Sequence, residues 1–543
     1  MIKYGLRQEE YYMDDINRLS CVTKREHMKG NMFMDNFRSG QFTVRMCRDT
    51  YNYFKKHLQE KKNSLLQNII QEHLYIDVYE GIARGKTQVD STSGAMVGEA
   101  SRQANKTKIY YGLLKEPDLA LPPEEDDDGG ADGADGDKPK KKKIKKDPYL
   151  AKKSRIDPNA PPPNRVPLPE LKDADKLDRL NALRESTKRV KLGPESLPSI
   201  CFYTFLNNHH GVTCATISED SSLLSAGFTD SVIRVWNLTG DKLRAIKSAT
   251  ELDIIDKDAD DVMFRIMDEN KSSEVKVLCG HTGAIYATSF NPDKSLLVSC
   301  SEDSTVRLWS LFTWTNIVCF RGHCFPVWDV KFSPFGYYFA SCGHDNTARL
   351  WATDSAQPLR IFAGHVSDVD CVQFHPNCNY VATGSSDRTV RLWDLVSGSC
   401  VRFMTGHKAV IFCLAFSACG RFLASGGGDK KVLVWDLAYG HLLAELSGHT
   451  NTIYSLAFSR EGTVLSSGAL DCTVKVWNVQ KLFDDIDPED LNIAHTPHVR
   501  QSDGGRVNCE ALLLGSYPTK STPPICLHFT RRNLLLAAGI FQS

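Results

Sequence analysis

The sequence lacks several features that would mark a common class of protein. No uncharged apolar run reaches the length of about 18 residues that a membrane helix needs, and MIKYGLRQEEYYMDD has no basic start followed by an apolar stretch. The 17 cysteines form no CxxC pair, and no GxxxxGK[ST] phosphate loop occurs. We therefore expect a soluble, unsecreted chain with reduced cysteines and with no metal or cofactor.

Net charge is also absent, because 66 Lys and Arg residues balance 66 Asp and Glu residues. Any electrostatic attraction must then be local, and no direct contact with nucleic acid, membrane or small-molecule substrate is predicted. One local feature stands out: eight carboxylates at 124–137 precede seven lysines at 138–146. This composition predicts a disordered linker over 116–170. The lysine block is typical of a nuclear localisation signal, carried by Lys140, Lys141, Lys142, Lys143, Lys145 and Lys146.

The 543 residues are too many for one core, so several regions are expected. Helical periodicity after Asp49, and again over 64–74, predicts a small partial helical domain over 1–115. Leucines at helical spacing predict a linker helix within 171–195.

A 42-residue period organises the rest of the chain. Each unit places a His 18 residues before a small hydroxyl, the hydroxyl four before an Asp, and the Asp six before a Trp. The five sets are His281, Ser299, Asp303, Trp309; His323, Ser341, Asp345, Trp351; His365, Thr383, Asp387, Trp393; His407, Ser425, Asp429, Trp435; and His449, Ser467, Asp471, Trp477. Runs such as TVRLW and YVATGS predict short strands between these positions.

This pattern resembles the WD-repeat family, whose repeat forms a four-stranded blade of a β-propeller. The resemblance implies an all-β, seven-bladed propeller over 196–543, beside a small mainly α N-terminal domain and a disordered linker. Degenerate repeats flank the five regular ones: Ala226 and Asn208 replace the first hydroxyl and His, and ICLHFTRRNLLLAAG supplies two strands of the last blade. SICFYTF (199–205) should be the outer strand of that blade, whose third strand has no assignment.

A hydroxyl, an imidazole and a carboxylate are also the groups of nucleophilic catalysis. Catalysis needs one such set in a cleft with an oxyanion site, whereas this set recurs around a ring. The resemblance implies instead a hydrogen-bonded chain inside each blade. We predict no catalytic residue and no metal site.

Two surface features could bind a partner. Five residues after each repeat His, at the channel mouth, stand Tyr286, Trp328, Asp370, Phe412 and Tyr454. Aromatic rings with an acid would suit a peptide carrying Lys or Arg, or the rings could simply plug the channel. Two acidic insertions break the period, one that includes 253–269 and one at 483–505. In the geometry of the WD-repeat family they should lie between third and fourth strands, where they could offer a docking surface or be ordinary variable loops.

Segments outside the repeats make the resemblance more specific, among them QEHLYIDVYEG, IIDKDADDVMFRIMDE and LHFTRRNLLLAAG. Together they resemble the WD-repeat TATA-binding-protein-associated factors, the subunit 5 family of general transcription factor TFIID. Members begin with a LisH motif and a longer helical domain, of which this sequence holds the last part from about Ile16.

The resemblance implies a nuclear, non-enzymatic scaffold that organises histone-fold TFIID subunits and supports RNA polymerase II preinitiation complex assembly. Two alternatives remain: a subunit of a SAGA-type histone acetyltransferase complex, and a WD-repeat substrate adaptor of a ubiquitin ligase.

Overall fold

A computed structural model of the chain divides it into two compact units, residues 1–92 and 93–543. In the second unit the structure describes residues 158–162, 165–169, 173–206, 211–247, 249–252, 265–484 and 512–542, with a few residues before 115. In the first unit it describes only short strands.

The described strands of the first unit are β1 (Phe42–Cys47), β2 (Leu74–Tyr79) and β3 (Gln88–Val89). β1 and β2 pair in parallel, with Phe42 opposite Leu74. The helices predicted after Asp49 and over 64–74 lie outside the described residues.

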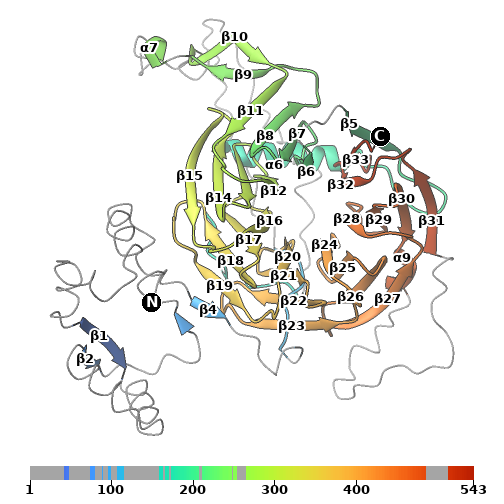
Figure 1. Cartoon of the computed structure of the whole chain (residues 1–543). Helices are drawn as coiled ribbons and strands as arrows, with labels where there is room; N and C mark the ends of the chain where they lie inside the picture. The colour runs from blue at the N-terminus through green and yellow to red at the C-terminus, as the bar shows by residue number, and fades with distance from the viewer. Residues whose placement is uncertain are drawn as a thin grey trace, which may run out of the picture. The chain divides into compact units, whose positions relative to one another are not determined.

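The second unit holds the predicted propeller, and Figure 1 shows its blades arranged around a central axis. Blade 1 is β6 (Val212–Ile217), β7 (Leu223–Phe228), β8 (Val232–Asn237) and β11 (Val275–Cys279). Blade 2 is β12 (Ile285–Phe290), β13 (Leu296–Ser301), β14 (Thr305–Ser310) and β15 (Thr315–Arg321). Blade 3 is β16 (Val327–Phe332), β17 (Tyr338–Gly343), β18 (Thr347–Ala352) and β19 (Arg360–Ala363), to which β4 (Met96–Gly98) adds in parallel.

Blades 4 to 6 repeat the same antiparallel order. Blade 4 is β20 (Val369–Phe374), β21 (Tyr380–Ser385), β22 (Thr389–Asp394) and β23 (Cys400–Thr405). Blade 5 is β24 (Ile411–Phe416), β25 (Phe422–Gly427), β26 (Lys431–Asp436) and β27 (His441–Ser447). Blade 6 is β28 (Ile453–Phe458), β29 (Val464–Ala469), β30 (Thr473–Asn478) and β31 (Leu513–Pro518).

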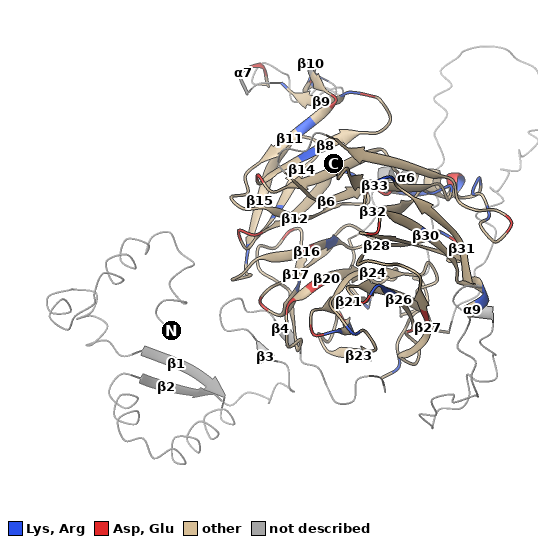
Figure 2. Cartoon of the chain, turned by 45° about the vertical axis from the view of Figure 1, so that its right-hand side comes forward, with Lys and Arg blue, Asp and Glu red and all other residues tan. Residues whose placement is uncertain are grey.

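Apolar packing between neighbouring blades holds the ring together. Every residue of β17, β21 and β25 is buried, and Figure 2 colours most of the blade strands tan because few of their residues are charged. At Gly384, an added Cβ would lie 2.6 Å from Cys371 Sγ and 2.7 Å from Ile411 in the next blade. Only glycine therefore allows blades 4 and 5 to approach this closely.

The seventh blade closes the ring with three strands. β32 (Pro524–Phe529) pairs antiparallel with β33 (Leu535–Ile540), and β5 (Ile200–Phe205) pairs directly with β33 in parallel. SICFYTF is thus the outer strand, as predicted. In an antiparallel blade the second and fourth strands run the same way, so a fourth strand placed beside the second must pair with it in parallel.

We call the end of the propeller that carries the Gly-His loops the entry face. Because the strands alternate in direction, the loops after first strands and after third strands share the opposite face. The insertions lie there, after β8 and after β30, as the resemblance to the WD-repeat family implied. The first contains β9 (Leu243–Ile246), α7 (Ala249–Leu252) and β10 (Met267–Ser273), and the second begins with α9 (Gln480–Asp484). Residues 253–264 and 485–511 lie outside the described residues.

Part of the predicted linker contacts the opposite face. Arg165 donates to both carboxylate oxygens of Asp394 at 3.0 and 2.9 Å, and it also reaches the Tyr380 hydroxyl. Ile109 is buried in the core of blades 4 and 5, and the backbone N–H of Gly112 bonds to the carbonyl of Asn159. Gly112 and Asn159, which precede and follow the acidic and basic segment in the sequence, are thereby held beside one another. α6 (Asp173–Ser186) follows within the range predicted for the linker helix.

The pairing of β5 with β33 predicts how proline substitutions in β5 change the free energy of unfolding. In the parallel ladder, Leu535 N donates to Ser199 O and Phe541 N donates to Phe205 O, so odd-numbered residues of β5 face β33. We expect Cys201→Pro to lower the free energy of unfolding by about 1–3 kcal/mol, because it removes a ladder donor. Thr204→Pro, whose N–H faces the outer edge, should cost less. Equal losses in denaturant titrations would contradict this closure.

Candidate functional site

The repeated polar residues join into one hydrogen-bonded chain per blade. In blade 4, His365 Nδ1 lies 2.8 Å from Asp387 Oδ2, and His365 Nε2 lies 2.8 Å from Thr383 Oγ1. The Trp393 indole N–H donates to the same hydroxyl at 2.9 Å. Equivalent chains, with distances of 2.7–2.9 Å, are His281–Ser299–Asp303–Trp309, His323–Ser341–Asp345–Trp351, His407–Ser425–Asp429–Trp435 and His449–Ser467–Asp471–Trp477.

The chain is fully satisfied when the imidazole is neutral. His365 Nδ1–H then donates to Asp387, the Thr383 hydroxyl donates to Nε2, and the Trp393 N–H donates to the hydroxyl oxygen. Burial lowers the pKa of His365 and outweighs the opposing effect of Asp387. Burial would raise the pKa of Asp387, but hydrogen bonds from His365 and Thr389 hold it well below its usual range. The pair is therefore a neutral imidazole beside a carboxylate.

Burial also decides against a nucleophilic role. The Thr383 side chain is 0% exposed, so no substrate can reach its hydroxyl in this structure. Its oxygen is already occupied by Trp393 and His365. Each polar chain instead ties the first loop of a blade to its second and third strands. The arrangement fixes strand register, since unpaired buried polar groups cost about 1–3 kcal/mol each.

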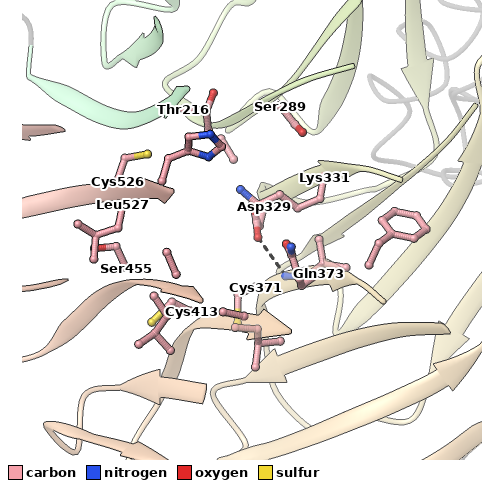
Figure 3. Close-up of a pocket in the computed structure, with 18 of the residues that line it drawn as sticks. Thr216, Ser289, Asp329, Lys331, Cys371, Gln373, Cys413, Ser455, Cys526 and Leu527 are labelled. Atoms are coloured by element: carbon pink, nitrogen blue, oxygen red, sulfur yellow. Dashed lines mark hydrogen bonds and ion pairs between the residues drawn. The ribbon is translucent and has the colours of Figure 1, made fainter. Parts of the chain in front are cut away.

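The first strands of all seven blades surround a central channel of about 860 Å³. Figure 3 shows Thr216, Ser289, Lys331 and Gln373 along its wall. One layer carries Cys214, Cys371, Cys413 and Cys526, and Asp329 takes the equivalent position in blade 3. Burial raises the pKa of these thiols, so they are neutral and unreactive.

Asp329 was not predicted from the sequence. Its carboxylate accepts the backbone N–H of Val372 at 3.0 Å, a bond marked in Figure 3, and lies 3.8 Å from Lys331 Nζ. Asp329 therefore links blade 3 to blade 4. The signal was visible as a charged residue in the otherwise apolar start of VWDVKF, at the position that cysteines occupy in four other blades.

The structure also brings together the predicted partner-binding residues at the mouth of this channel. Tyr286, Trp328, Asp370, Phe412 and Tyr454 all line it, with Thr213 and Ile525 at the equivalent positions of blades 1 and 7. Tyr286 packs against Trp328 with ring centroids 4.9 Å apart, and Phe412 stacks on Tyr454 at 4.9 Å. The rings line the same cavity as the deeper residues of the first strands.

The predicted nuclear localisation signal is not tested by the structure. The lysines Lys140, Lys141, Lys142, Lys143, Lys145 and Lys146 lie outside the described residues. Among the described residues, no group of His, Cys, Asp and Glu side chains has the geometry of a metal site. None of the described helices is long and apolar enough to cross a membrane.

Comparison with known proteins matches two families. The WD domain, G-beta repeat, matches residues 200–237, 272–310, 314–352, 356–394, 398–436 and 440–478. The WD40 associated region in TFIID subunit, NTD2 domain, matches residues 1–74. The NTD2 match therefore begins before the resemblance seen from Ile16 onward.

Relatives match more than half of the chain. "Transcription initiation factor TFIID subunit 5" of Drosophila melanogaster is 50% identical over 325 residues, which cover 59% of this chain and 46% of that protein. "SAGA complex/transcription factor TFIID complex subunit Taf5" of Schizosaccharomyces pombe is 34% identical, covering 56% of this chain and 46% of that protein. A human "TAF5-like RNA polymerase II p300/CBP-associated factor-associated factor 65 kDa subunit 5L" is 35% identical, covering 56% and 42%. The matched part spans about half the length of these relatives.

The blades, their polar chains and the repeat matches define the chain as a WD-repeat β-propeller protein. Within that class it groups with the proteins named TFIID subunit 5, because the NTD2 model matches residues 1–74 and relatives of that name match 58–59% of the chain.

A substitution in blade 4 tests the structural role of the polar chain. Thr383→Val keeps the side-chain volume but leaves Trp393 Nε1 and His365 Nε2 without their partner. We expect the free energy of unfolding to fall by about 1–3 kcal/mol. The control Thr405→Val removes an exposed hydroxyl of the same blade and should be neutral. Equal stability of both variants in urea titrations would contradict the assignment.

Acid should destabilise the propeller in two steps. Burial lowers the pKa of His323, His365 and His449 below the ordinary 6.5, so the unfolded chain binds protons first as pH falls below about 6.5. The lowered pKa values of Asp303, Asp345 and Asp387 add a further loss as pH falls below their ordinary 3.8. Unfolding free energy should therefore decrease from pH 7 to pH 5 and again below pH 4. An increase between pH 7 and pH 5 would contradict the neutral-imidazole assignment.

Proposed function

We propose that the chain is a non-enzymatic scaffold subunit of a TFIID complex, which helps to organise histone-fold subunits and supports RNA polymerase II preinitiation complex assembly. The observation that carries the proposal is the combination of an NTD2 match at residues 1–74, WD repeats over 200–478 and 50% identity over 325 residues to a protein named TFIID subunit 5. A propeller alone would fit many functions, but this combination is specific.

The physical properties of the propeller support a scaffold. Its ring is closed, since the first strand of each blade contacts the next and β32 contacts β6. The polar groups that resemble a catalytic set are buried and paired within each blade. A closed and rigid body presents its loops at fixed positions, which suits the assembly of several partners.

The opposite face is the proposed docking surface for other subunits. Both insertions leave the propeller there, after β8 and after β30, and their sequences are acidic. The first is held to blade 2, because the indole N–H of Trp314 donates to the carbonyl of Arg244 at 2.8 Å. The segments around Ile109, before the predicted linker, and Arg165, within it, lie on the same face. A partner docking there would contact loops, insertion and linker together.

A SAGA-type histone acetyltransferase complex is the second candidate. The Schizosaccharomyces pombe relative carries both complex names. The Drosophila relative has higher identity, 50% against 34%, which favours TFIID. A substrate adaptor of a ubiquitin ligase has no comparable support, because the family model that matches residues 1–74 is described as a region of a TFIID subunit.

Affinity purification of the tagged full chain from nuclear extract tests the proposal. Histone-fold TFIID subunits should be recovered in amounts comparable to the chain itself. Recovery of acetyltransferase-complex subunits alone would favour the SAGA-type alternative, and recovery of a cullin would favour the adaptor. Recovery of neither TFIID nor SAGA-type subunits would contradict the scaffold proposal.

A matched variant separates assembly from location. Replacing Lys140, Lys141, Lys142, Lys143, Lys145 and Lys146 by alanine leaves the described propeller residues unchanged. If this lysine block is the nuclear address, the variant should be depleted from nuclear extract and should still bind TFIID subunits when mixed with them in vitro.

A further inference from the structure

The mouth of the central channel on the entry face combines partly exposed aromatic rings with a carboxylate that forms no ion pair with any described lysine or arginine. In ring order its residues are Thr213, Tyr286, Trp328, Asp370, Phe412, Tyr454 and Ile525. Asp370 stands between the Tyr286–Trp328 pair and the Phe412–Tyr454 pair. The Tyr454 side chain is 40% exposed and the others are half-buried.

The carboxylate of Asp370 is held in place without being neutralised. The Ser386 hydroxyl donates to Asp370 Oδ2 at 2.8 Å. Within the described part of the chain, no lysine or arginine forms an ion pair with Asp370. Burial, with the nearby charge of Asp368, raises the pKa of Asp370 to about 6. A half-buried carboxylate of this kind is stabilised by an incoming positive charge.

The neighbouring carboxylate, Asp368, already accepts hydrogen bonds from two side chains. Asp368 Oδ2 accepts from His344 Nδ1 at 2.7 Å and from the Trp328 indole N–H at 3.3 Å. These contacts fix the orientation of the Trp328 ring beside the mouth. Of these two acids, Asp370 is therefore the one available to a ligand.

Charge deeper in the channel limits how far a cation can enter. Lys331 lies one layer below the level of Asp329, and the two side chains approach within 3.8 Å. A second positive charge at that depth would be repelled by Lys331. A cationic group should therefore stop at the level of the aromatic rings.

Apolar side chains extend the mouth outward on the same face. Phe325 is 50% exposed and packs edge-on against His344 at 5.5 Å, and Val366 is 81% exposed. Exposed apolar residues gathered beside a pocket are typical of a protein-binding surface. They would contact the backbone and flanking residues of a peptide whose charged side chain enters the mouth.

We propose that the entry-face mouth binds an extended segment of another protein through one Arg or Lys side chain. The cation lies beside the aromatic rings and forms a charge-assisted hydrogen bond with Asp370. The site does not depend on which complex contains the chain, because it is formed by the propeller alone.

Binding of short labelled peptides to the full chain tests this site. The probes are alanine pentapeptides with a central arginine or lysine, and matched peptides with citrulline or acetyl-lysine, followed by fluorescence anisotropy. We expect at least one cationic peptide to bind about tenfold more tightly than its neutral counterpart. A preference for arginine would indicate bidentate pairing with Asp370, and a preference for lysine a point-charge contact. Equal binding of charged and neutral peptides would overturn the proposal.

Paired variants locate the binding. Trp328→Ala and Asp370→Asn should each weaken the cationic peptide about tenfold and leave the neutral peptide unchanged. Tyr439→Ala and Glu461→Gln, an exposed aromatic and an exposed acid away from the mouth, are the controls and should have no effect. Unchanged affinity in both mouth variants would overturn the site. If Trp328→Ala unfolds the chain, Asp370→Asn, which is nearly isosteric, still decides the outcome.

The chain's own lysine block is the competing occupant. If it fills the mouth, replacing Lys140, Lys141, Lys142, Lys143, Lys145 and Lys146 by alanine should strengthen peptide binding, which would contradict a partner segment as the ligand. Unchanged affinity in that variant supports a segment of another protein.

Discussion

The buried hydrogen-bonded chain of hydroxyl, imidazole, carboxylate and indole is the interaction on which the propeller depends. It recurs in blades 2 to 6, with distances of 2.7–2.9 Å in each. A first strand could slide by two residues along its neighbour and still bury apolar side chains. Such a slip would leave buried polar groups unpaired, and several such groups cost more than a typical domain can lose. The polar chains therefore select one register for each blade.

The repeat spacing was enough to predict most of this framework. The 42-residue period indicated which His, hydroxyl, Asp and Trp belong together, and the structure joins those residues. The period predicts these contacts because every regular blade places the same residue types at the same positions of its strands and loops. Blade 7 is different, because none of the repeated residues lies between β5 and β33. Their parallel pairing follows from strand direction alone, so the repeat pattern does not predict it. Asp329 and the Arg165–Asp394 contact were missed for a similar reason, because each joins segments that the period does not relate.

The residues that stabilise the propeller differ from those proposed to bind partners. The polar chains and Gly384 serve the ring itself, and the ring is closed between β32 and β6. The proposed contacts with partners belong to residues that vary between repeats. These are the mouth of the channel on one face, and the insertions and linker on the other. Two separate binding faces on one rigid body are what a scaffold needs to hold partners at a fixed distance.

The protonation state of the repeat histidines is the most direct test of the central claim, that the polar chains are structural and contain neutral imidazoles. Histidine-selective ¹⁵N labelling distinguishes an Nδ1–H imidazole from an imidazolium. For His323, His365 and His449, whose pKa values burial lowers, the account predicts neutral Nδ1–H rings that stay unprotonated from pH 8 to pH 6. Protonation of these rings near pH 6.5 in the folded protein would contradict it.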